Sequence, residues 1–168
     1  MTTEHGKPPS ASQVEMTEIV FPADANPQGS AFGGKVFAWC DLAGGLAANR
    51  HSRCHVVTAG MDDLDFVRPI RVGQIVILYA QVNAVFDTSM EVGVRVETEE
   101  IKTGVRQHVL TVYMTFVALD ETRKPTKVVP LVPVTEEDRR RLLDATERRR
   151  VRLERRQRKA ERLLQEIG

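Results

Sequence analysis

The sequence contains little cysteine, few aromatic residues and no long apolar run. Its two cysteines, Cys40 and Cys54, are too few for a disulfide framework and suit a reducing compartment. The first residues, "MTTEHGKPPSASQ", lack the apolar core of a signal peptide, and no apolar stretch is long enough to span a membrane. We therefore expect a cytoplasmic protein without a membrane segment.

An excess of one charge is also missing, since the formal net charge is only +1. The distribution is nevertheless uneven. Residues 135–168 contain 12 Lys and Arg against 8 Asp and Glu, whereas the preceding residues have a net charge of −3. The basic residues of this segment are interleaved with acids, have no aromatic partners and show no helix-turn-helix pattern. These features argue against nucleic-acid binding.

The basic segment itself is predicted to be one long helix. Thr135 and Asp138 have the spacing of a capping box, and neither Pro nor Gly interrupts the segment before Gly168. One apolar seam consists of Leu142, Thr146, Arg149, Leu153, Arg156, Ala160, Leu163 and Ile167. Because two of these positions are arginine, a strong coiled coil is disfavoured. We expect a solvated helix that docks partly on the body.

Three segments between residues 74 and 120 alternate apolar and polar residues with the period of a β-strand. Their apolar sets are Val76, Leu78, Ala80, Val82, Ala84 and Phe86, then Met90, Val92, Val94 and Val96, then Leu110, Val112, Met114, Phe116 and Ala118. The short connections "DTS" and "KTG" predict antiparallel neighbours. Residues 14–21 and the stretch "HVVTAGMDDLDFVRPI", ended by Pro69, supply two further predicted strands.

The stretch "AFGGKVFAWCDLAGGLAA" (residues 31–48) is predicted to be an apolar helix. A helix with almost no polar face is expected to be enclosed by protein on most sides. Asp41 in its middle is the exception, because an unpaired buried carboxylate is strongly unfavourable. Gly44 and Gly45 weaken the helix and indicate that a strand or a second subunit passes close to it.

One helix combined with a continuous antiparallel sheet predicts an α+β protein of the hot-dog type. In this fold a curled antiparallel sheet wraps around a long central helix. We expect residues 1–12 to be a disordered N-terminus, residues 13–134 to form the hot-dog domain, and residues 135–168 to form the C-terminal helix.

Four stretches in order resemble the acyl-CoA thioesterases of the hot-dog superfamily, in particular the cytosolic acyl-CoA hydrolases. They are "PADANPQGSAFGGKVFAWCDLAGG", "VVTAGMDDLDFVRPIRVGQ", "TSMEVGVRVETE" and "TFVALDETRKPTKVVPL", and together they cover roughly residues 14–134. One departure is "MDDLDF", which places Asp62, Asp63 and Asp65 where the family usually carries fewer acids.

The resemblance implies hydrolysis of an acyl-CoA thioester to a free acid and CoA, with no metal and no cofactor apart from the CoA of the substrate. It also implies homodimers that share a sheet, often as trimers of dimers, with active sites at the dimer interface. The family's catalytic pair matches Asn26 and Asp41. By resemblance, Asn26 of one chain is expected to face Asp41 of the other.

The residues themselves suit this chemistry. Asp41 could deprotonate a water or attack the carbonyl itself. Gly33 and Gly34 fall at the helix start, where backbone N–H groups have no intrahelical partner and could stabilise an oxyanion. Thr58 lies in a strand that could face the helix and support Asp41. Hydrogen bonding within the sheet explains the same threonine equally well.

Coenzyme A carries a diphosphate and a 3′-phosphate, which require cationic or hydrogen-bonding donors. We expect Arg68, Arg71, Thr88 and Ser89 to supply them. The histidines lack the spacing of metal ligands, and no arrangement around Cys40 indicates a cysteine nucleophile.

Two other functions compete with the hydrolase. A hot-dog enoyl-CoA hydratase would need a histidine near the acid, and neither the loop before the helix nor the helix through Asp41 contains one. A non-catalytic acyl-CoA sensor would need a DNA-binding module, for which the basic segment shows no pattern.

Overall fold

The structure is a computed structural model, and it describes residues 6–167. Its strands are β1 (Val14–Ile19), β2 (His55–Met61), β3 (Ile75–Phe86), β4 (Ser89–Glu99) and β5 (Arg106–Leu119). Its helices are α1 (Gly33–Ser52) and α2 (Glu136–Ile167), with short 3-10 turns η1 (Pro9–Ser12) and η2 (Pro22–Asp24). No described helix combines the length and the apolar character needed to cross a membrane.

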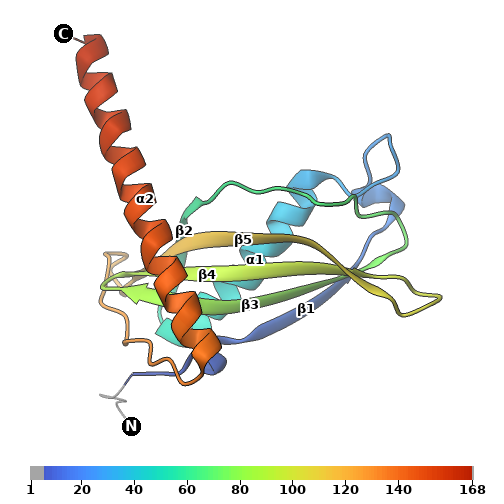
Figure 1. Cartoon of the computed structure of the whole chain (residues 1–168), viewed down its shortest axis with the longest axis horizontal. Helices are drawn as coiled ribbons and strands as arrows, with labels where there is room; N and C mark the ends of the chain where they lie inside the picture. Colours follow the sequence, from blue (N-terminus) through green and yellow to red (C-terminus); the bar gives the residue numbers. More distant parts are fainter. Residues whose placement is uncertain (1–5, 168) are drawn as a thin grey trace.

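The five strands form one antiparallel sheet in the order β1-β3-β4-β5-β2. Figure 1 shows α1 on one face of this sheet and α2 crossing the strands on the other. The predicted α+β hot-dog fold with an additional C-terminal helix is confirmed. The predicted strand after residue 55 is shorter than expected, because β2 ends at Met61 and residues 62–70 form an irregular connection.

The core lies between α1 and the inner face of the sheet. The alternating apolar residues of β4 and β5 are fully or almost fully buried there, together with Val36, Cys40, Ala43 and Ala47 of α1. Gly44 permits the close approach of helix and sheet. A Cβ at Gly44 would lie only 3.0 Å from the ring of Phe116 on β5, so a larger residue would push the two elements apart.

A β-bulge changes which β3 residues face the core. The register shifts between Val82 and Ala84, because Asn83 is an extra residue relative to β4. Beyond the bulge, Val85 pairs with Met90 of the core, whereas Phe86 pairs with Ser89. The expectation that Ala84 and Phe86 continue the inner face of Val76 to Val82 is therefore wrong, since Ala84 pairs with Glu91, which faces α2. The bulge turns Phe86 to the outer face, where α2 contacts it.

Residues 6–12 are ordered, contrary to the expected disorder of residues 1–12; residues 1–5 lie outside the described part. Lys7 bridges to Leu131 and donates a hydrogen bond of 2.6 Å to the His51 carbonyl at the end of α1. The ring Nε2 of the buried His51 lies 2.9 Å from the Val129 carbonyl oxygen. The N-terminal segment therefore ties α1 to the chain that follows β5.

The predicted start of α2 is confirmed by reciprocal capping. The Asp138 N–H donates to the Thr135 hydroxyl over 3.0 Å, and the Thr135 N–H donates to the Asp138 carboxylate over 2.9 Å. The helix docks on the outer face of the sheet through the buried Ala145 and through a group of arginines. Its far end extends past the sheet (Figure 1).

Candidate active site

Asp41 is held by a residue of the neighbouring strand. The Thr58 hydroxyl donates a hydrogen bond of 2.6 Å to Asp41 Oδ1. Thr58 pairs with the core residue Phe116 in the sheet, so it lies on the inner face toward α1. The register shift after Thr58 marks a bulge, a feature that often redirects side chains beside functional sites.

The expected enclosure of α1 is not found within one chain. The face of α1 that contains Val36, Cys40 and Ala43 is buried, but Asp41 is exposed. The physical reason is that five strands cover only one side of the helix. The uncovered surface is largely apolar and includes Phe37, Leu42 and Leu46 on α1 together with Met61, Phe66 and Val67. Asp41 therefore lies on an apolar surface of this protomer.

Asn26 lies in a tight loop before α1. Its side-chain oxygen accepts hydrogen bonds from the N–H groups of Gln28 at 3.0 Å and Ser30 at 3.3 Å. Asn26 thus organises its own loop, and within residues 6–167 its amide nitrogen has one hydrogen-bond partner, the Ser30 hydroxyl at 3.3 Å. Asp41 follows Gly33, the first residue of α1, by eight positions, which is about 12 Å along the helix axis.

Gly33 and Gly34 form the first turn of α1. Within residues 6–167, no hydrogen bond from the N–H of either glycine to the backbone is recorded. A Cβ at Gly33 would meet nothing within 4 Å, so a substrate atom has access to this backbone. The lack of a backbone partner is what the first turn of a helix predicts, and the role of these two N–H groups in stabilising an oxyanion stays a prediction.

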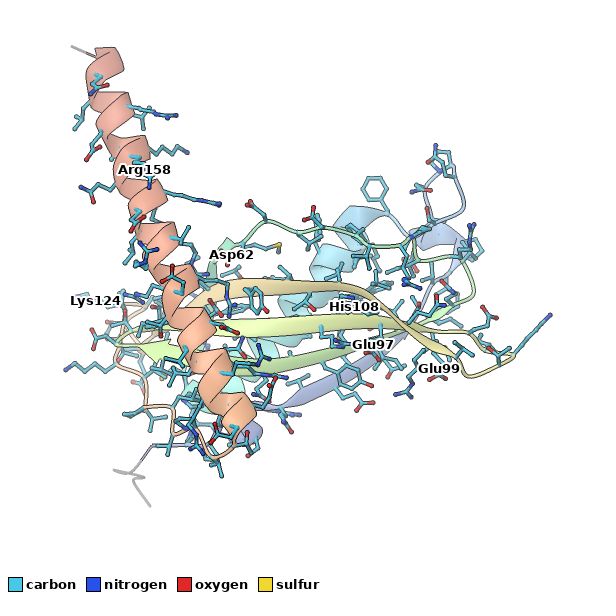
Figure 2. All side chains as sticks on the ribbon, in the orientation of Figure 1. Asp62, Glu97, Glu99, His108, Lys124 and Arg158 are labelled. Atoms are coloured by element: carbon cyan, nitrogen blue, oxygen red, sulfur yellow. The ribbon has the colours of Figure 1, made fainter. Side chains whose placement is uncertain are left out.

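The four residues expected to bind CoA lie at two ends of the sheet. Arg71 bridges to Ser30, so it is adjacent to the Asn26 loop, and Arg68 is exposed three residues earlier. Thr88 and Ser89 lie in the β3–β4 hairpin at the opposite end (Figure 1). Lys124 lies at this second end as well (Figure 2). One chain does not bring the two groups together.

Cysteine chemistry is disfavoured at this site. Cys40 is adjacent to Asp41 in sequence but faces the core, and its burial, followed by the charge of Asp41, raises its pKa to about 12. A thiol with such a pKa is not a nucleophile near neutral pH. Both cysteines are free thiols.

Comparison with known sequences is decisive for the family. The thioesterase superfamily model matches residues 28–105. The uncharacterized acyl-CoA thioester hydrolase YkhA of Bacillus subtilis is 43% identical over 127 residues, which cover 76% of this chain and 74% of YkhA. This chain belongs to the thioesterase superfamily. Acyl-coenzyme A thioesterase 11 of Mus musculus is 38% identical over 89% of the chain, but the chain spans only 27% of that protein's length.

Solved structures of the thioesterase superfamily are similar in fold. An apo-hexameric acyl-CoA thioesterase has a TM-score of 0.85 and 38% identity, covering 89% of this chain and 97% of its own. A second similar structure is acyl-CoA hydrolase from Staphylococcus aureus in complex with butyryl coenzyme A, coenzyme A and coenzyme A disulfide. It has a TM-score of 0.87 and 30% identity, and the match covers 95% of this chain and 98% of that one. Alanine variants of that enzyme at one aspartate, one threonine and one asparagine are also solved.

Sequence reasoning missed several contacts of this thioesterase-superfamily chain. Phe66, from the irregular connection after β2, packs against Phe37 with ring centroids 6.0 Å apart, one helical turn from Asp41. Asp62, noted only as an unusual acid, forms an ion pair of 2.6 Å with Arg152 of α2. The acidic residues after β2 and the basic residues of α2 have complementary charges, which was the available signal. Because the two segments are about 90 residues apart in sequence, their pairing could not be predicted.

Proposed function

We propose that this chain hydrolyses acyl-CoA thioesters, with Asp41 as general base or nucleophile. The observation that carries the proposal is the carboxylate itself, oriented by Thr58 on an otherwise apolar surface. An acyl chain needs such a surface, and a thioester carbonyl needs the polar group within it. The cytoplasm, where free thiols such as Cys40 and Cys54 persist, is the proposed compartment.

The Staphylococcus aureus hydrolase supports these roles through residue spacing. The asparagine, aspartate and threonine replaced in that enzyme are separated by fifteen and seventeen residues. Asn26, Asp41 and Thr58 have the same types, order and intervals. Because the coincidence involves three residues on a loop, a helix and a strand, it supports one shared site rather than three unrelated similarities.

The proposed reaction starts with a water beside Asp41. The carboxylate takes a proton from the water as its oxygen attacks the thioester carbon, and the carbonyl oxygen becomes an oxyanion. The charge is stabilised at the positive end of an α1 dipole by the N–H groups of the partner's Gly33 and the partner's Gly34, because Gly33 of the same chain starts its helix about 12 Å from Asp41. Collapse of the intermediate breaks the C–S bond, and the CoA thiolate leaves and takes up a proton. The reaction uses no cofactor, since CoA is part of the substrate.

The site is proposed to be shared between two chains. The outer edge of β2 has no strand partner among residues 6–167, and the apolar surface beside it is uncovered. Exposed edges of this kind favour pairing with a second chain. A two-fold dimer through β2 would cover the exposed face of α1 and bring the partner's Asn26 loop toward Asp41.

The same dimer would unite the two groups proposed to bind CoA. Antiparallel pairing of β2 with its copy would place the Arg68 and Arg71 end of one chain beside the Thr88 and Ser89 end of the other. The hexameric relative makes a trimer of such dimers the proposed assembly.

Release of free thiol tests the function directly. The full chain is incubated with acyl-CoAs of increasing chain length and a chromogenic thiol reagent, and the Asp41→Asn variant serves as the control. We expect thiol release by the wild-type chain that depends on Asp41. Hydration of an enoyl-CoA without thiol release would show a hydratase instead. Tight acyl-CoA binding without turnover would show a sensor.

A further inference from the structure

We infer that α2 carries a phosphate-binding site for the substrate, formed by Arg149 and Arg156 over the β3–β4 hairpin. This inference rests on the proposed function for the identity of the ligand, but the site itself is defined by side chains of this chain. It gives α2 a role in recognition as well as in packing.

Most arginines of α2 have carboxylate partners. Arg139, Arg140, Arg141, Arg148, Arg150, Arg152, Arg155 and Arg158 all form ion pairs. Among the side chains that the structure describes (residues 6–165), Arg149 and Arg156 of this helix form no ion pair with a carboxylate. These two arginines are seven residues apart, hence on the same face of the helix.

That shared face covers a small hollow on the outer side of the sheet. The hollow has a volume of about 170 Å³, and both Arg149 and Arg156 line it. Facing them are the hydroxyl-bearing residues Thr88, Ser89 and Thr115. A volume below the roughly 300–1,000 Å³ of whole-ligand sites suits one part of a ligand rather than all of it.

The chemistry of the lining selects an anion. Arg149 is half-buried and stacks on Phe86, with its guanidinium carbon 4.3 Å from the ring centroid. It also donates to the Ser89 hydroxyl over 3.3 Å. The guanidinium is therefore held in place while its charge is not neutralised by a carboxylate. Arginine and hydroxyl donors together are the usual partners of phosphoryl oxygens.

The bulge at Asn83 is what makes this arrangement possible. Without it, Phe86 would point into the core and Arg149 would lose its stacking surface. Ser89, opposite Phe86, faces the same outer side. The site therefore combines the irregular end of β3, the hairpin and the middle of α2. CoA offers two kinds of phosphoryl group to it, the diphosphate and the 3′-phosphate.

The test compares an Arg149→Gln/Arg156→Gln double variant with an Arg162→Gln variant of the full chain. Arg162 is the control, because it is an exposed arginine of the same helix but follows Arg158 on the part of α2 beyond the sheet (Figure 2). Calorimetry measures CoA binding, and steady-state kinetics compare an acyl-CoA with the matching acyl-pantetheine, which lacks the diphosphate and the nucleotide.

We expect the double variant to weaken CoA binding and raise the KM for acyl-CoA by about tenfold or more, since charged hydrogen bonds are lost. The loss should be confined to the phosphorylated substrate, and Arg162→Gln should bind CoA as the wild type does. Dephospho-CoA assigns the occupant. If it binds the wild type as weakly as CoA binds the double variant, the occupant is the 3′-phosphate; otherwise it is the diphosphate.

Unchanged CoA binding in the double variant would overturn the inference. An equal loss on acyl-pantetheine would also overturn it, because it would indicate damage to the fold. The proposed function is tested separately by the wild-type chain. If that chain releases no thiol but its CoA binding still falls in the double variant, the phosphate site stands and the hydrolase proposal fails.

Discussion

The Thr58 hydroxyl lies 2.6 Å from the Asp41 carboxylate and joins the middle of α1 to β2. This bond fixes one oxygen of the carboxylate and leaves the other for chemistry. We expect Thr58→Val to lower kcat by roughly ten- to a hundredfold, because the shape is kept but the donor is lost. Thr58→Ser should keep most of the rate. Equal losses in both variants would contradict an orienting hydroxyl.

Asp41→Asn should lower the maximal rate of thioester cleavage by about two or more orders of magnitude. The amide is a poor base and a poor nucleophile, although it fills the same space. The thermal midpoint should change little, since Asp41 is exposed in the protomer. Near-normal turnover by this variant, measured as thiol release, would exclude the catalytic role.

The shared site predicts complementation between two inactive variants. Asn26→Ala and Asp41→Ala chains, co-expressed, should recover roughly a quarter of wild-type activity. Random mixing makes about half of the dimers mixed, and one of the two sites in each mixed dimer carries no substitution. If both residues came from the same chain, every site would retain a lesion, and the mixture would show no gain over the separate variants.

Buried Glu91 predicts a stability effect that depends on α2. Its carboxylate is fully buried beneath Arg148 at 2.7 Å and Arg152 at 2.9 Å. In the full chain, Glu91→Gln should lower the free energy of unfolding by about 2–3 kcal/mol, because the charge that pairs with both arginines is lost.

A chain ending at Val134 provides the control for Glu91. The sheet should still fold without α2, because Glu91 then faces water and no buried charge is left unpaired. In this shortened chain Glu91→Gln should change the free energy of unfolding little, and urea titration measures both backgrounds. An insoluble shortened chain would show that α2 is indispensable to the core.

His51 predicts a loss of stability in acid. Burial lowers its pKa, more than the Val129 carbonyl contact raises it, so protonation favours the unfolded chain. The stability that the neutral His51 side chain contributes is fully present above the ordinary histidine pKa of about 6.5. It is lost as the pH falls below that value. The free energy of unfolding should therefore fall less between pH 7 and 5 in His51→Gln than in the wild type. His55→Gln, at an exposed histidine, serves as the control. If the free energy of unfolding of His51→Gln fell with pH as steeply as that of the wild type, His51 would not be the source of the acid sensitivity.

Periodicity predicted the sheet well because each long strand has one face in a single continuous core. Met90 to Val96 and Leu110 to Ala118 are buried as their alternation indicated. The same reasoning failed at Phe86, since a bulge depends on the pairing with β4 and leaves no mark in the alternation of β3 itself.

The site was predictable to the extent that it resides in local sequence. A carboxylate in an apolar helix is conspicuous in one stretch, so Asp41 could be named directly. Its exposure could not be predicted, because the same apolar pattern fits a helix enclosed by its own sheet and one covered by a partner. The role of Arg149 could not be predicted either. That it forms no ion pair becomes clear only when the carboxylate partners of the other α2 arginines are known.

Adjacent residues of α1 face opposite sides, with Cys40 in the core and Asp41 on the uncovered surface. Selection can therefore act on the two sides separately. Substitutions at Phe37, Leu42 or Leu46 would reshape the surface around the carboxylate without creating cavities beneath the sheet. Substitutions at Ala43 or Gly44 would strain the helix against β5 before they altered any surface near the carboxylate. A lineage can thus acquire new acyl preferences along one side of this helix while the other side remains fixed.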